Sequence, residues 1–253
     1  MKTERNRAGL FRRGFSLFVD ATVVFVPFQI VAAILFAITA GQVQFNHGVT
    51  FTSCYKATGV PADLKPAPPE NANAARVCKT TFFGAEIARH LTVSRITKTD
   101  STTTSVGQTY MLDAHDKPID GWSLDWPAWP VLLAYLFTMR LRRGGTLGDK
   151  TNKIILVDDS LKTMSPPGVR QMAVRTLVQI GPMAAAVLAT LMLAYLDNDS
   201  AEQLTAAGHW IWLIAFAAPV VLFYLVSGIQ IALKRDPPWD RVARTAMLVR
   251  AAE

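Results

Sequence analysis

Charged side chains are scarce in this chain of 253 residues, because Asp, Glu, Lys and Arg together make up only 18% of it. Soluble domains average about 25%. The shortage, together with a hydrophobic content of 51%, excludes an intrinsically disordered chain and argues against an ordinary soluble domain. The few charges are also unbalanced, with a formal net charge of +7. Their places along the chain therefore carry information.

Enzyme signatures are absent as well. The sequence contains no GxSxG, HExxH, GxxxxGK[ST] or GxGxxG pattern, so it predicts no hydrolase, zinc or nucleotide site. The histidines do not have the spacing of metal ligands either. They are His47, His90, His115 and His209. We therefore predict no enzymatic activity, no catalytic residue, no metal and no cofactor.

The apolar residues gather in four blocks, each long enough for a membrane span of about 20 residues. The block at 15–40 contains one charge, Asp20, and the block at 122–141 is the weakest because it contains Asp125 and Arg140. We predict an all-α membrane protein with four transmembrane helices and a small β-rich insertion between the first two. The predicted parts are a basic N-terminus with the first helix (1–40), the insertion (41–121), the second helix (122–141), a basic loop (142–175), the third helix (176–196), a short loop (197–208), the fourth helix (209–233) and a basic tail (234–253).

Basic residues are concentrated in three stretches outside the apolar blocks. Residues 1–14, 140–175 and 234–253 hold 18 of the 26 Lys and Arg residues. Because cytoplasmic segments of membrane proteins carry such an excess, we predict that both termini and the loop at 142–175 are cytoplasmic. This topology explains the positive charge, so no nucleic-acid partner is predicted. Tryptophans, which favour membrane interfaces, lie at the predicted outer ends of the second and fourth helices. They are Trp122, Trp126, Trp129, Trp210 and Trp212.

The insertion at 41–121 contains both cysteines of the chain, Cys54 and Cys78. On the outer, oxidising side of a membrane we expect them to form a disulfide. A metal site built from His47, His90 and the two thiols is the alternative. Four stretches have the β-branched and aromatic content of short strands. These are 49–55, 77–83, 90–97 and 110–112.

Asp20 is the sharpest single feature, because a carboxylate inside a spanning helix is costly and often functional. Three interpretations remain open: a structural ion pair with a neighbouring helix, an ion or solute pathway, and a shallow position near the membrane surface. Arg13 shares a helix face with Asp20 but is too distant along the helix for an ordinary pair. Arg175, or else Arg170, is the expected partner of Asp20.

The predicted cytoplasmic loop begins with a basic cluster, Arg140, Arg142 and Arg143, followed by glycines. Such clusters beside a span attract anionic lipid. We therefore expect the partners of this chain to be the lipid bilayer, with anionic lipid at the cytoplasmic face, and other copies of the chain or subunits of a membrane complex.

Three short stretches form a set that reaches from one end of the chain to the other. The first places Arg13 at the start of an apolar helix and an aspartate inside it. The second is a GTLG stretch followed by an apolar run that ends in aspartate, with Arg175 opening the next helix. The third is WDRVART near the C-terminus. The positions concerned are Arg13, Asp20, Gly145, Thr146, Leu147, Gly148, Asp158, Arg175, Asp240 and Thr245. Together they resemble the RDD family of bacterial membrane proteins, although the insertion lies outside the resemblance.

The resemblance implies a multi-pass protein of the bacterial inner membrane. Arg13, Asp20 and Asp240 would be the arginine and two aspartates that name the family, with Asp158 as the alternative to Asp240. The sequence departs from the family at Asp149, where lysine is usual, and at Trp239, where histidine is usual.

The family is commonly described as candidate transporters, and some members have been linked to sodium/proton exchange. The resemblance therefore implies transport of ions or small solutes. The alternative function is a non-enzymatic accessory or assembly subunit of a larger membrane complex, with the insertion contacting a partner.

Overall fold

A computed structural model describes residues 6–61, 64–98, 102–160, 165–196 and 207–249, without the side chains of 193–196 and 207–213. The helices are α1 (Leu10–Ile38), α2 (Asp125–Arg143), α3 (Leu147–Thr151), α4 (Val169–Leu196), α5 (Ala207–Ala232) and α6 (Pro238–Ala243). The strands are β1 (Val43–Gln44), β2 (Phe51–Lys56), β3 (Ala74–Phe82), β4 (Ala85–Lys98), β5 (Thr103–Met111), β6 (Trp122–Ser123), β7 (Ile154–Asp158) and β8 (Thr245–Val249). Within the predicted loop at 197–208, residues 197–206 lie outside the described residues. The side chains of Trp210 and Trp212 are not described either.

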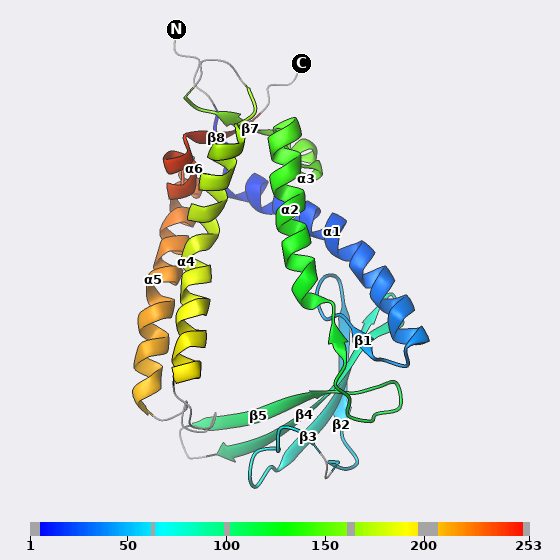
Figure 1. Ribbon diagram of the computed structural model, residues 1–253. Coiled ribbons are helices and arrows are strands. Elements are labelled where there is room, and N and C mark those ends of the chain that lie inside the picture. The colour runs from blue at the N-terminus through cyan, green and yellow to red at the C-terminus, as the bar shows by residue number, and fades with distance from the viewer. Residues whose placement is uncertain (1–5, 62–63, 99–101, 161–164, 197–206, 250–253) are drawn as a thin grey trace. The chain divides into compact units, whose positions relative to one another are not determined.

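The prediction of an all-α protein with four transmembrane helices is wrong. The described residues form six helices and eight strands in three sheets (Figure 1). Among them, three helical stretches are long and apolar enough to cross a membrane. They are Leu10–Ile38, Val169–Met192 and Ile214–Ala232. In α2, Asp125 and Arg140 confine the uncharged stretch to 126–139, which is shorter than the span of about 20 residues that a bilayer needs.

The apolar helices present bare hydrophobic faces. On α4 and α5, large side chains are more than half exposed. They include Leu188, Leu191, Met192, Leu222 and Leu225. Contiguous exposed apolar surface on this scale is unusual on a soluble monomer. Helix length and exposed apolar surface together indicate association with a membrane.

The chain divides into two compact units, the first formed by residues 1–20 and 134–253 and the second by 21–133. In the first unit, β7 and β8 pair antiparallel, with Ile154 opposite Val249. We call α3, β7, α6 and β8 the cap. Its core contains Leu156 and Met247, with Ala8 and Met172 packed beside them. The predicted loop at 142–175 and tail at 234–253 are therefore largely ordered into one small structure, because apolar strands distant in sequence bury each other.

Trp239, the residue that replaces the usual histidine of the family pattern, lies in the cap. It is the second residue of α6, and its side chain is buried with its ring 5.9 Å from that of Phe223 in α5. Trp239 therefore fixes α6 against α5, which positions the neighbouring Asp240.

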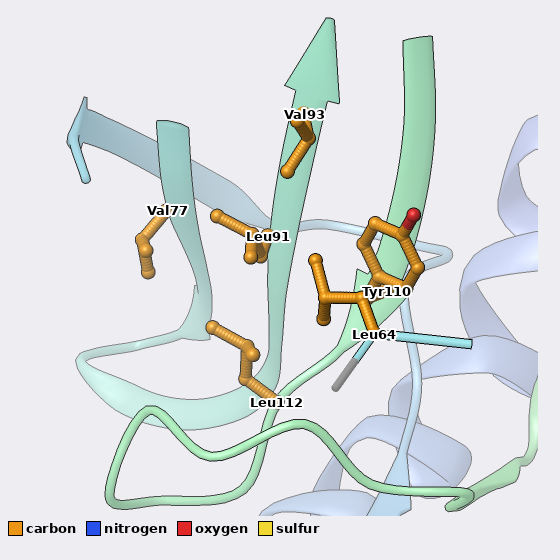
Figure 2. Packing of buried hydrophobic residues seen from close by; sticks show 6 residues of the cluster. All are labelled: Leu64, Val77, Leu91, Val93, Tyr110 and Leu112. Atoms are coloured by element: carbon orange, nitrogen blue, oxygen red, sulfur yellow. The ribbon is translucent and has the colours of Figure 1, made fainter. Parts of the chain in front are cut away.

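The second unit contains a four-stranded antiparallel sheet in the order β2-β3-β4-β5 and a short parallel pair, β1 with β6. Figure 2 shows the core on one face of this sheet, where side chains of β3, β4 and β5 meet Leu64 from the segment between β2 and β3. The cluster contains Leu64, Val77, Leu91, Val93, Tyr110 and Leu112. The Tyr110 hydroxyl donates to the Pro66 carbonyl at 2.9 Å, so its polar end is satisfied as well.

The disulfide between Cys54 and Cys78 is confirmed. The two residues face each other in the register of β2 and β3. The thiols are therefore not available as metal ligands, and His47 instead contacts Asp125 at 2.7 Å. The four predicted strands are present. β5 begins earlier than predicted, and its first half was not predicted because it is mostly polar and exposed.

Candidate functional site

Asp20 is fully buried in α1, inside the first unit. Its Oδ2 accepts a hydrogen bond from the Thr146 hydroxyl at 2.6 Å. Its Oδ1 accepts from the Gly148 N–H at 2.8 Å and from the Tyr135 hydroxyl at 3.2 Å. Each of these donors is neutral. Among the described residues, no Lys, Arg or His forms an ion pair with Asp20.

The start of α3 supplies two of these donors. Thr146 is the N-cap of α3, and it forms a capping box with Asp149 in which each side chain accepts from the other residue's N–H. Such boxes satisfy the free N–H groups at a helix start. Because the Thr146 hydroxyl accepts from the Asp149 N–H, its own proton points to Asp20. The capping box therefore orients one donor to Asp20.

Gly148 allows α1 and α3 to approach closely. A Cβ at this position would overlap the Ser16 carbonyl oxygen and lie 3.0 Å from the Asp20 carboxyl carbon. Any other residue would push the two helices apart. Gly145 is less confined, since its Cβ would lie 3.2 Å from that of Asp149.

Asp149 is a second buried carboxylate, and its partner is charged. Its Oδ2 lies 2.9 Å from the Arg140 Nε, and its Oδ1 accepts from the Ser16 hydroxyl at 2.6 Å. Burial alone would raise the pKa of Asp149, but the charge and hydrogen bonds of Arg140 outweigh it and lower the pKa to about 2. Asp149 is therefore held ionised as the counter-charge of Arg140.

Asp149→Asn tests this pair through pH. The folded pKa of about 2 lies below the ordinary value of 3.8, so the pair stabilises the fold above pH 4 and this gain is lost as the pH falls toward 2. At pH 7 the free energy of unfolding of the variant is expected to be about 2 kcal/mol lower than that of the native protein. In denaturant titrations this difference in stability should disappear near pH 2. A stability difference that stays constant with pH would contradict the ion pair between Asp149 and Arg140.

Asp240, in α6, is the third buried carboxylate and has two charged partners. Its Oδ2 lies 2.8 Å from Arg13 and its Oδ1 lies 2.7 Å from Arg175. Thr245 also donates to Oδ1, at 3.3 Å. Burial acts to raise the pKa of Asp240, but the charges of Arg175 and Arg13 keep it below the ordinary value. This cluster joins α1, α4 and the cap.

Three carboxylates and three arginines thus form one buried polar network whose formal charges cancel. Arg140 interacts electrostatically with Asp20 and Asp240 as well as with its partner Asp149, which links the two clusters. The network lies within the first unit. Its members are Asp20, Asp149, Asp240, Arg13, Arg140 and Arg175.

The structure brings most of the sequence-predicted site residues together, with different partners. Arg175 pairs with Asp240, and not with Asp20 as expected. Asp158 lies outside the network and binds the Ser160 hydroxyl. Leu147 is 42% exposed and contributes only its N–H, which donates to the Tyr135 hydroxyl.

Sequence reasoning missed four residues of the site: Ser16, Tyr135, Arg140 and Asp149. Arg140 was interpreted as the basic flank of a span, a role that needs no partner. Tyr135 and Ser16 lie in apolar blocks where single hydroxyls are common. A signal existed for Asp149 alone, because Thr146 and Asp149 have the spacing of a capping box.

In comparisons with known proteins, no family model matches this sequence, and no curated protein matches it either.

Proposed function

We propose that this chain is a non-enzymatic membrane protein that exchanges a proton for a monovalent cation at Asp20. The observation that carries the proposal is the contrast among the three buried carboxylates. Asp149 and Asp240 are paired with arginines, whereas Asp20 is held only by hydroxyl and amide donors. Arg140 interacts with Asp20 electrostatically but forms its ion pair with Asp149. Asp20 can therefore accept a proton or a cation without breaking an ion pair.

The surroundings of Asp20 suit that exchange. The hydroxyl oxygens of Thr146 and Tyr135 lie beside the carboxylate, and oxygen atoms of this kind are the ligands that hard cations prefer. Asp20 also belongs to a helix of membrane-spanning length, where ionisable residues commonly mark ion pathways.

The family resemblance supports the same proposal, since Arg13, Asp20 and Asp240 would be the arginine and two aspartates that name the RDD family, with Asp158 as the alternative to Asp240. We further propose that the protein belongs to the bacterial inner membrane with both ends of the chain in the cytoplasm. Arg7 and Leu248 form a β-bridge, which supports placing the two ends on one side. Because three spans alone would separate the ends, this proposal requires the shorter helix α2 to return the chain across a locally thinned bilayer.

Flux measurements in vesicles test the proposal. The native protein, reconstituted with a pH dye inside, is expected to move protons out when Na⁺ or K⁺ is added outside. Asp20→Asn should reduce this flux to the level of empty vesicles, because an amide cannot exchange a proton. Asp116→Asn is the matched control, since Asp116 is half exposed in the second unit.

A milder variant keeps the test decisive if Asp20→Asn does not fold. Tyr135→Phe removes one neutral hydrogen bond to Asp20 and should change the flux by about fivefold. Absence of flux in the native protein, or full flux in Asp20→Asn, would overturn the proposal.

The second candidate function is an accessory or assembly subunit, which the sheet of the second unit favours. Its edge strand β2 is exposed at every residue, and Phe83, which follows β3, is 91% exposed. Exposed edges are templates for strand addition from another chain. Gentle detergent extraction followed by crosslinking should then capture a partner through β2. A homo-oligomer without any other protein would contradict this role.

A further inference from the structure

We propose that a pocket in the first unit binds the headgroup of an anionic phospholipid. The pocket has a volume of about 430 Å³ and lies where α1 begins and α5 ends. Its wall combines Leu10, Phe11 and Ala232 with three cations, Arg7, Arg12 and Lys234. This site is separate from the Asp20 network, and its occupancy does not depend on ion exchange.

Two of the three cations are available to a ligand. Arg7 forms ion pairs with Asp236 and Asp159. Arg12 and Lys234 are exposed, and no carboxylate in the described part of the chain forms an ion pair with either of them. A phosphate group between Arg12 and Lys234 would therefore meet two uncommitted positive charges.

The apolar side of the pocket favours a lipid over free phosphate. Phe11 begins a row of stacked rings along α1, with centroids 6.3 Å apart to Phe15 and 6.2 Å onward to Phe18. The three residues are 83%, 46% and 60% exposed. Since α1 has the length and hydropathy of a membrane span, an acyl chain can lie along this row while its headgroup occupies the pocket. A soluble anion has no acyl chain to pack against these rings.

Lipid binding to the purified full chain tests the site. The protein, stripped of lipid in detergent, is titrated with dioleoylphosphatidylglycerol or dioleoylphosphatidylcholine, and bound lipid is measured by native mass spectrometry. The native protein should prefer phosphatidylglycerol. The double variant Arg12→Gln, Lys234→Gln should bind it about 30-fold more weakly, because each cation near an anionic lipid contributes about a factor of five.

A matched control removes the same charge elsewhere. Arg142 and Arg143 are exposed at the end of α2 and do not line the pocket, so Arg142→Gln, Arg143→Gln should change the affinity by less than about twofold if binding is local. Equal losses in the two double variants would show diffuse attraction and overturn the proposal. If the double variant does not fold, Lys234→Gln alone should weaken binding about fivefold.

Two further measurements separate the lipid from a free anion. Phe11→Ser should weaken binding of dioleoylphosphatidylglycerol but leave binding of its water-soluble headgroup, glycerophosphoglycerol, unchanged. Inorganic phosphate should not displace the lipid at millimolar concentration. Displacement by inorganic phosphate, or equal affinity for the two phospholipids, would overturn the proposal.

Discussion

Asp240→Asn is expected to lower the free energy of unfolding by about 3–5 kcal/mol, because it leaves two arginines without their shared counter-charge. The side chains of Arg13 and Arg175 are only 9% and 4% exposed, so water cannot replace the lost carboxylate. The asparagine amide would also point a donor at one of them. Denaturant or thermal unfolding of the detergent-solubilised protein measures the loss.

A surface carboxylate gives the matched control. Asp116 pairs with Arg89 but is 49% exposed, and Arg89 keeps Glu86 as a second partner. Asp116→Asn should therefore cost less than about 1 kcal/mol. The double variant Arg175→Gln, Asp240→Asn should be less destabilised than the sum of its two single changes, since it removes an uncompensated charge. Strict additivity, or a small effect of Asp240→Asn, would show that the pairs do not stabilise the fold.

Gly148→Ala is expected to cost about 3 kcal/mol, at the upper end of the usual range for overpacking. The added methyl group would overlap the Ser16 carbonyl, which belongs to the backbone of α1 and cannot rotate away. The separation of α1 from α3 would also lengthen the hydrogen bonds from Thr146 and Gly148 to Asp20. Ion flux should therefore fall together with stability.

Gly181 provides the control for this substitution. It lies inside α4, and a Cβ there meets nothing within 4 Å. Gly181→Ala should therefore be neutral, or stabilising by up to about 1 kcal/mol through helix propensity. If both alanine variants unfold at the same temperature as the native protein, the close approach at Gly148 is not a constraint.

Local patterns in the sequence predict part of this structure. Apolar runs indicate three of the described helices, because hydropathy is a property of consecutive residues. Cys54 and Cys78 predict their disulfide, since no other cysteine is present to compete. The β-branched stretches predict the sheet of the insertion for the same local reason.

The cap and the buried network could not be predicted in this way. The strand β7 pairs with β8, which lies far along the chain, and neither strand reveals its partner. The arginines of the network look like the basic flanks of membrane spans, and only the fold shows that Arg140 faces Asp149 and that Arg175 faces Asp240. Which distant charges pair depends on how the helices and strands pack together. Local sequence patterns do not specify that packing.

Infrared difference spectroscopy tests the exchange at Asp20 most directly. Spectra of the native protein in vesicles are recorded at fixed pH before and after Na⁺ is added. If Asp20 releases its proton to water as the cation binds, a carbonyl band of a protonated carboxyl group disappears as a carboxylate band grows, and Asp20→Asn shows neither change. An identical difference spectrum in Asp20→Asn, or no change in the native protein, would contradict the account.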